Sequence, residues 1–321
     1  MRTVRFTSTN RRLDAVYSFF LGRDRLNRSD AIWAYVFCLP WLIGFVMLTV
    51  GPFIVSAVMS FFEWRGFGKA TFRGFYNFEW IFTRDRLFRQ ALNVTFTFTG
   101  MSVPITLVVS FLVASVLSRD LKGVTVYRAI FYLPSVVTGV AVAFMWMYIF
   151  DPLRGPLNVL LQPLLGLEEP IPWLSSPDWV LPSFTVMRVW GLGTSMIILL
   201  AGLKSIPKSM YEIATIDGAS GVQKFWYVTL PMVSPSLFYV LVIGTIQSFQ
   251  VLTGPLVIFD SSAQGGPLNA GLFYSVYLYT KAFAEGRMGY ASALAWILFV
   301  IVLALTLINF LVFGKRVYYE K

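Results

Sequence analysis

The chain has 321 residues, of which 57% are hydrophobic, 17% aromatic and only 13% charged. Soluble domains carry about 25% charged residues, so this composition excludes a soluble protein and indicates one built for lipid. A net charge of +10 would suggest a nucleic-acid partner in a soluble protein. In a membrane protein, basic residues instead flank the spans and meet anionic headgroups. The sequence has no His and a single cysteine, Cys38, which removes the commonest metal ligand and any internal disulfide.

The first thirty residues contain Arg11 and Arg12 before the short apolar segment AVYSFFLG. This pattern faintly resembles a signal sequence, but the apolar stretch is short and lacks a small-residue cleavage site. Arg23, Asp24 and Arg25 follow it at once. We therefore expect residues 1–30 to form a cytoplasmic tail that can include an interfacial amphipathic helix.

Six uncharged or nearly uncharged runs follow in chain order, each long enough for the roughly 20 residues that cross a hydrocarbon core. They predict an all-α membrane protein, a bundle of six transmembrane helices within residues 31–314. The expected spans are 33–60, 91–117, 125–150, 179–203, 235–258 and 289–313. A seventh charge-free stretch, 261–280, is rich in Gly, Pro and polar groups, so we expect a loop or an interfacial helix there.

Lys and Arg gather in the N-terminal tail, the turn 119–128, the segment 204–234 and the tail 315–321. The positive-inside rule therefore predicts that both termini and the segment 204–234 lie in the cytoplasm. The Arg-rich loop 65–89 argues against this orientation, but the other loops outweigh it. Trp173 and Trp179, in the loop before the fourth span, fit an aromatic belt at the outer membrane surface.

Residues 211–231, YEIATIDGASGVQKFWYVTLP, form a polar island between the fourth and fifth spans. Pro207 suits the first turn of a helix that opens the island, and Gly218 marks the point where the chain reverses. Ser220 and Gln223 have the spacing of a capping box for a second helix. The island is thus predicted to be helix, Gly turn and helix, followed by a stop at Leu230-Pro231.

Several kinds of chemistry are missing from the chain. It contains no G-x-x-x-x-G-K-[ST] phosphate loop, no Cys/His metal cluster and no Ser–His pair. None of the predicted spans contains the Asp or Glu that a proton-coupled carrier needs. We therefore expect a chain that is not an enzyme, binds no cofactor itself and is driven from outside.

The island resembles the "EAA" loop of permease subunits of ATP-binding-cassette (ABC) importers. The matching residues are Glu212, Ala214, Asp217, Gly218, Ala219, Phe225, Val228, Leu230 and Pro231. Ile213 replaces the usual second Ala, and Val228 the usual Ile, and both exchanges are apolar. YRAIFYLPSVVTGVAVAFMWMYIFDP, PWLSSPDWVLPS, LAGLKSIPKSMYEIA, GGPLNA and MGYASALAWIL all resemble the carbohydrate-uptake subgroup. The residues before Ala31 have no such match.

The resemblance implies a non-catalytic transmembrane permease subunit, multi-pass in the cell inner membrane, whose EAA loop seats in a cytoplasmic ATPase. The coupling residues would be Glu212, Ile213, Ala214, Asp217, Gly218, Ala219, Leu230 and Pro231. The implied partners are a second permease (a different one, with a homodimer left open), two ATPase subunits and an extracytoplasmic solute-binding protein. ATP and Mg would bind on the ATPase.

Four polar residues are candidates for the substrate path: Arg188, Gln247, Ser248 and Gln250. Arg188 lies midway along the fourth span, where a charge is expensive and normally faces a cavity or a partner. One hypothesis is that Arg188 pairs with the carboxylate of an acidic sugar such as a uronate. The other is a salt bridge or carbonyl contact that holds helices or subunits together. Gln247, Ser248 and Gln250 suit sugar hydroxyls, and equally suit hydrogen bonds between helices.

The expected function is therefore import of a sugar or oligosaccharide, acidic if Arg188 contacts it. Alternatives are a permease of the same architecture for a polyol, glycerol phosphate or peptide, or a stand-alone secondary carrier. The carrier would need intramembrane carboxylates or inverted repeats, and the sequence shows neither.

Overall fold

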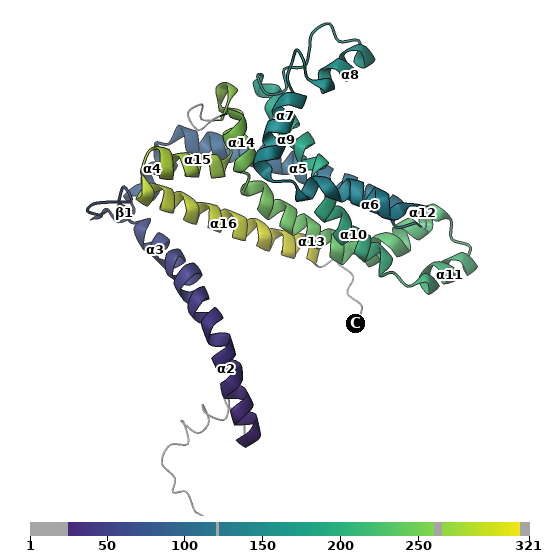
Figure 1. Ribbon diagram of the computed structural model, residues 1–321, viewed down its shortest axis with the longest axis horizontal. Helices are drawn as coiled ribbons and strands as arrows, with labels where there is room; N and C mark the ends of the chain where they lie inside the picture. Colours follow the sequence, from purple (N-terminus) through teal and green to yellow (C-terminus); the bar gives the residue numbers. More distant parts are fainter. Residues whose placement is uncertain (1–24, 120–121, 260–264, 315–321) are drawn as a thin grey trace, which may run out of the picture. The chain divides into compact units, whose positions relative to one another are not determined.

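The computed structural model describes residues 25–119, 122–259 and 265–314. Most of the N-terminal tail and the tail 315–321 lie outside these residues, so their predicted roles stay predictions. Within these residues the regular structure is helical apart from one short antiparallel hairpin, β1 (Phe62–Glu63) and β2 (Thr71–Phe72) (Figure 1). The chain separates into two compact units, Met1–Val58 and Met59–Lys321.

The first span is one helix with a π-helical turn in its middle. It consists of α2 (Arg25–Phe45), η1 (Val46–Val50) and α3 (Gly51–Met59). The N–H of Gly51 bonds to the carbonyl of Val46, five residues earlier. Pro52 follows directly, and its ring excludes the usual hydrogen bond at this point, which explains the π turn. The helix begins inside the predicted tail, and Ile32–Met59 is long and apolar enough to cross a membrane.

The second unit contains the remaining helices. Its α-helices are α4 (Tyr76–Thr83), α5 (Arg86–Leu117), α6 (Val124–Tyr132), α7 (Gly139–Ile149), α8 (Pro156–Leu165), α9 (Pro177–Trp190), α10 (Gly193–Lys204), α11 (Lys208–Ile216), α12 (Gly221–Lys224), α13 (Leu230–Phe249), α14 (Thr253–Phe259), α15 (Tyr274–Tyr279) and α16 (Met288–Phe313). Shorter turns are the 3-10 helices η2 (Leu133–Val136) and η5 (Pro267–Asn269) and the π-helices η3 (Phe225–Thr229) and η6 (Thr280–Ala284).

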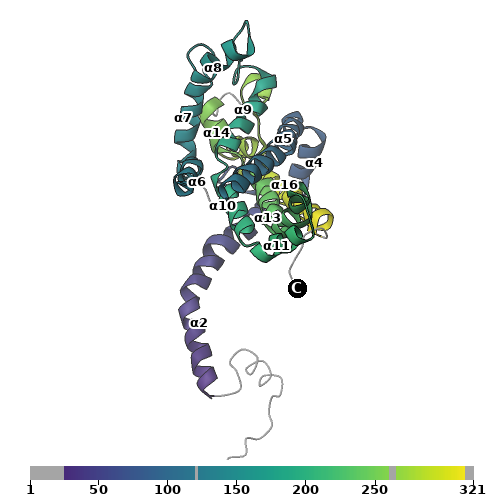
Figure 2. The same cartoon turned by 90° about the vertical axis from the view of Figure 1, so that its right-hand side faces the viewer.

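Four helical stretches of the described chain are long and apolar enough to cross a membrane, and up to six if each of two bent pairs counts as one span. The third and fourth predicted spans are these bent pairs rather than single helices. The segments Val124–Val136 and Gly139–Ile149 meet at 101°, and Pro177–Trp190 and Gly193–Lys204 at 50°. Figure 2 shows the first pair, α6 and α7, along the left side of the second unit.

Each bend has a local cause. After α6, Pro134 lies in the 3-10 turn η2, and Val137 and Thr138 then take extended backbone angles. At the second bend, Gly193 lies directly against the backbone of the last turn of α6. A Cβ added at Gly193 would lie 2.8 Å from the carbonyl oxygen of Phe131, so only glycine allows this close approach.

The predicted stop at Leu230-Pro231 is wrong. Helices α12, η3 and α13 follow one another from Gly221 to Phe249 without a break. Pro231 lies in the first turn of α13, directly after the π turn of η3. The wider π turn accommodates the missing N–H of the proline, so the helix continues.

The long helix α5 is at the centre of the second unit and contacts α9, α10, α13 and α15. Its first half packs into a cluster with α9, α15 and the start of α16, and its second half into a cluster with α10 and α13. The helix α16 runs beside α13, with the Phe238 and Phe310 rings 4.9 Å apart (Figure 1). A third cluster joins α7 to the loop that contains α8.

Two surface assignments need correction. Trp173 is 5% exposed and stacks on Phe150 rather than lying in an outer aromatic belt. Its indole N–H donates to the buried side chain of Asn158, so the loop is a packed structure of its own. The stretch 261–280 contains η5 and α15 where it is described. Tyr274 and Tyr277 of α15 are buried, so this helix is part of the core rather than the expected loop or interfacial helix.

Candidate functional site

Arg188 lies on α9 and reaches across to two other helices. Its Nη2 donates to the carbonyl oxygen of Gly244 on α13 at 2.6 Å, and its Nη1 to Ser102 Oγ on α5 at 3.3 Å. The guanidinium also lies over the Phe98 ring, 5.8 Å from its centroid. The expected carbonyl contact between helices is therefore present. Within the described residues, no carboxylate forms an ion pair with Arg188.

Two cavities in the helix bundle share Arg188 and Gln247 as lining residues, and share no others. The larger cavity has a volume of about 280 Å³, close to the lower end of small-ligand pockets. The smaller, of about 70 Å³, has room for about two water molecules. The larger cavity is also lined by Phe98, Gly139, Val142, Phe184, Met187, Val251 and Gly254. The smaller is also lined by Val103, Thr106, Leu107, Gly191, Ser195, Val240 and Gly244.

The positions of the lining residues in the chain show that the two cavities follow one another along the helices. On α5 the larger cavity uses Phe98 and the smaller uses 103–107, nearer the C-terminal end of the helix. The same order holds along α9–α10 and, in reverse, along α13, which runs in the opposite sense. The smaller cavity therefore lies on the side of α11 and α12. Arg188 and Gln247 form the wall between the two cavities.

The other two predicted path residues line neither cavity. Ser248 is buried, shares a hydrogen bond of 2.8 Å with Thr99 on α5 and donates to the carbonyl of Thr245. The bond to Thr99 holds α13 to α5, whereas the bond to Thr245 lies within α13. Gln250 is exposed at the C-terminal end of α13. The sequence does not single out Thr106, whose hydroxyl is buried beside the smaller cavity and has no hydrogen-bond partner among the described residues.

The island between the fourth and fifth spans has the predicted helix–turn–helix form. Gly218 has φ +76°, which favours glycine, and it ends α11 in a Schellman motif. The two bonds of this motif run from Gly218 N to Thr215 O and from Ala219 N to Ala214 O, at 3.1 and 2.9 Å. The predicted capping box of Ser220 and Gln223 is present in both directions. Pro207 is the N-cap of α11, one residue before the predicted position.

Two contacts between side chains tie the halves of the island together. The Tyr211 hydroxyl lies 2.9 Å from Thr229 Oγ1, and Lys224 Nζ donates to Thr215 Oγ1 at 2.9 Å. The eight predicted coupling residues divide into two groups. Glu212, Ile213, Asp217 and Gly218 are exposed, whereas Ala214, Ala219, Leu230 and Pro231 are half-buried. The exposed apolar surface is extended by Ile216, at 85% exposed, and by Val222, Trp226 and Tyr227.

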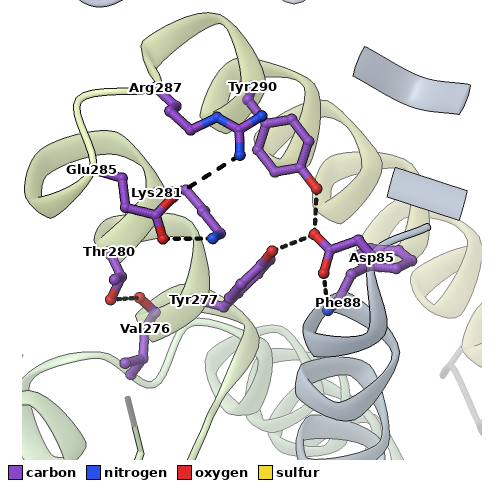
Figure 3. A network of polar contacts seen from close by, with 9 residues as sticks. All are labelled: Asp85, Phe88, Val276, Tyr277, Thr280, Lys281, Glu285, Arg287 and Tyr290. Carbon is purple, nitrogen blue, oxygen red and sulfur yellow. Dashed lines mark hydrogen bonds and ion pairs between the residues drawn. The ribbon is translucent and has the colours of Figure 1, made fainter. Parts of the chain in front are cut away.

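A network of polar side chains, missed by the sequence-based search, lies where α5 begins (Figure 3). Asp85 is the N-cap of α5 and accepts a bond from the N–H of Phe88 at 3.0 Å. The same carboxylate accepts short hydrogen bonds from the hydroxyls of Tyr277 and Tyr290. Burial, and then the bond to Asp85, raise the pKa of the Tyr277 hydroxyl well above its ordinary value.

Glu285 is a second acceptor in this network (Figure 3). It pairs with Lys281 at 2.5 Å and with Arg287 at 4.0 Å. Lys281 also lies over the ring of Tyr277, and Arg287 over the ring of Tyr290. The network therefore joins the start of α5 to α15, η6 and the start of α16. Among described residues, no group of His, Cys, Asp and Glu could hold a metal ion.

Comparisons with known proteins give one consistent family. Residues 82–321 match the family "Binding-protein-dependent transport system inner membrane component". The chain is 42% identical to the probable ABC transporter permease protein YesP of Bacillus subtilis (strain 168), over 94% of this chain and 96% of that protein. It is 30% identical to the sn-glycerol-3-phosphate transport system permease protein UgpA of Brucella abortus, over 91% of this chain and 98% of that protein.

The fold is similar to solved structures of a bacterial ABC transporter involved in the import of the acidic polysaccharide alginate. One has a TM-score of 0.75 and 24% identity and covers 89% of this chain and 97% of that chain. The other, in complex with alginate pentasaccharide-bound periplasmic protein, has a TM-score of 0.75 and 25% identity, and covers 88% of this chain and 93% of that chain. Together with the apolar helices, the matches identify a multi-pass protein of the cell inner membrane. The chain belongs to the family of binding-protein-dependent transport system inner membrane components and is an ABC transporter permease.

Proposed function

We propose that this chain is the non-catalytic permease subunit of an ATP-driven importer that takes a sugar or oligosaccharide from an extracytoplasmic binding protein. The observation that carries the proposal is the pair Arg188 and Gln247, which separates two cavities stacked along the helices. An amide and a guanidinium in such a wall present several hydrogen-bond donors and an acceptor to a polar solute. They also form the barrier that the solute must pass.

The proposed substrate is an acidic sugar. Arg188 forms no ion pair with any carboxylate in the described part of the chain, yet it borders both cavities. A charge in a membrane bundle normally has a partner, and a carboxylate on the solute would supply one in bidentate geometry. The similarity to the alginate importer supports this substrate class.

A second candidate is glycerol phosphate. The relative named a sn-glycerol-3-phosphate permease supports it, and a phosphate group would also suit Arg188. The size of the larger cavity, about 280 Å³, favours a sugar ring over this smaller solute.

The proposed assembly contains a second permease, two cytoplasmic ATPase subunits that bind ATP and Mg, and the binding protein. The exposed apolar side chains of the island, with Glu212, form the surface that would seat in the ATPase. The bonds between Tyr211 and Thr229 and between Lys224 and Thr215 would let the island move as one body. ATP-driven closure of the ATPases would then tilt the attached helices.

The test is ATPase activity of the complete complex in liposomes with its binding protein. The panel contains uronate oligosaccharides, neutral oligosaccharides of equal length, and glycerol phosphate. Stimulation by the acidic sugars alone is expected. Stimulation by neutral sugars would return Arg188 to a purely structural role, and stimulation by glycerol phosphate alone would select the second candidate. No response to any member would contradict a sugar importer.

A further inference from the structure

A third cavity, of about 410 Å³, lies between the hairpin β1–β2, α4 and the start of α16. We call it the hairpin pocket. Its lining includes Trp64, Arg65, Arg73, Tyr76, Asn77 and Arg287. It shares no lining residue with the two cavities of the bundle. The pocket is therefore not part of the path that Arg188 and Gln247 divide.

The floor of the hairpin pocket is held in place by backbone contacts. Gly289 N donates to the carbonyl of Trp64 at 3.0 Å. A side chain at residue 289 would collide with the carbonyl of Phe62, so glycine lets the hairpin lie directly on α16. Asn77 is 4% exposed, and its Nδ2 donates to the carbonyls of Ser60 and Phe62 at 2.8 and 3.0 Å. Both amide protons are thus used, and Oδ1 is left as the acceptor available to a ligand.

The charges around the pocket leave one arginine unpaired. Glu63 pairs with Arg73 at 3.1 Å, and Glu285 pairs with Lys281 and Arg287. Arg65 is exposed and forms no ion pair with any described residue. Glu63 and Glu285 also line the pocket. Because both carboxylates already have cationic partners, the pocket offers the guanidinium of Arg65 and suits an anionic group.

The surroundings of the pocket are those of a protein-docking surface. Trp64, Tyr76 and Arg65 line it, and these residue types dominate the binding energy of protein interfaces. Around it on the hairpin and at α4, Phe67, Phe72 and Phe75 are 80%, 67% and 73% exposed. Aromatic side chains and arginines are enriched at such interfaces relative to the rest of a protein surface.

The hairpin pocket also lies at the opposite end of α16 from the island helices α11 and α12. Figure 1 shows the hairpin at one end of α16 and the helices α11 and α12 beyond its other end. If the island faces the ATPases in the cytoplasm, the hairpin pocket faces the extracytoplasmic side, where the binding protein is found.

We propose that the hairpin pocket is a docking site for the extracytoplasmic binding protein, and that Arg65 receives an Asp or Glu side chain from one of its surface loops. The inference rests on the proposed function, because it names the partner of that importer. A protein loop is favoured over the transported sugar, since the pocket is separate from the cavities of the bundle and has an exposed aromatic rim.

The test uses the complete complex in nanodiscs. Surface plasmon resonance measures the Kd of the binding protein for this complex at low and high salt. Arg65→Glu is compared with Lys69→Glu, which makes the same charge change on the same exposed loop but outside the pocket. Arg65→Glu is expected to raise the Kd about tenfold or more at low salt, since it places a like charge opposite the partner's carboxylate. Lys69→Glu is expected to leave the Kd within about twofold.

Three outcomes would overturn the proposal. Equal Kd values for Arg65→Glu and the unaltered complex would remove the docking site, and an equal loss in Lys69→Glu would leave only long-range charge attraction. Binding of free oligosaccharide to the complex without binding protein, lost on Arg65→Glu, would make the pocket a sugar site. A different result would contradict the proposed function but not the docking site: the unaltered complex binds the binding protein, but no solute stimulates ATP hydrolysis.

Discussion

Single polar side chains join segments of this apolar chain that lie far apart in the sequence. Asp85 accepts three hydrogen bonds, from the backbone of Phe88 and from the hydroxyls of Tyr277 and Tyr290. The two tyrosines are 192 and 205 residues away in the chain. The N-cap role of an Asp before a helix is visible in a sequence, because it depends on neighbouring residues. The tyrosine partners are not, since only the packed fold brings them to this carboxylate.

Replacing Asp85 by Asn should lower the stability of the purified complex. The amide keeps one acceptor oxygen but loses the charge that strengthens the bonds, so we expect a loss of about 2 kcal/mol. Thermal unfolding in detergent measures it. Asp151→Asn is the matched control, because Asp151 accepts only the backbone N–H groups of Leu153 and Arg154 in a surface turn. Equal losses in both variants would show that the tyrosines contribute nothing.

Replacing Arg188 by Gln should reduce uptake of acidic sugars at least tenfold, because one charge-assisted pair contributes about 1.5–3 kcal/mol. The glutamine can still reach one helix neighbour, so assembly should persist. Uptake into liposomes and the amount of intact complex are measured together. Gln250→Ala is the control, since Gln250 lies outside both cavities. Loss of the assembled complex would instead assign Arg188 to helix packing.

At the scale of elements, the sequence predicts the features that depend on neighbouring residues and does not predict those that depend on long-range packing. The Gly218 turn and the Ser220–Gln223 capping box need only a few neighbouring residues, and both are present. Leu230-Pro231 predicts a stop, but the helix continues through a π turn that leaves no signal in the sequence. The sequence favours the membrane surface for Trp173, because the stacking of this residue on Phe150 depends on the folded loop.

Gly218 and Gly221 give a matched pair for testing the turn of the island. A Cβ would meet nothing within 4 Å at either position, but only Gly218 has a positive φ, of +76°. Gly218→Ala should cost about 1 kcal/mol or more, because alanine is strained in the left-handed region. Gly221→Ala should be neutral or slightly stabilising at the start of a helix.

The measurements for this pair are thermal unfolding and substrate-stimulated ATPase activity of the complete complex. Gly218→Ala should lower the stimulated rate more than Gly221→Ala does, since it displaces the surface proposed to seat in the ATPase. If Gly221→Ala is the more damaging of the two, the turn geometry is not what coupling requires.

At the scale of the whole molecule, the family and the apolar helices establish a multi-pass membrane protein, whereas the orientation still rests on charge distribution. Cys38 is the single cysteine, so a cysteine-free background needs one substitution. In that background, Lys69→Cys on the hairpin loop should react with an impermeant thiol reagent added to intact cells. Asp217→Cys in the island should react only after permeabilisation. The reverse pattern would invert the topology.

The unbroken helix from Gly221 to Phe249 has a mechanical consequence. At 1.5 Å per residue, the distance from its start in the island to Gln247 is about 40 Å. A rotation of about 5° at the cytoplasmic end of such a rod displaces the other end by about 3 Å, roughly the length of one hydrogen bond. The energy of ATP hydrolysis would thus reach the wall between the two cavities as simple leverage. The π turn of η3 and Pro235 inside α13 would be the compliant joints of this rod, because both interrupt its regular hydrogen bonds, and no helix would need to melt.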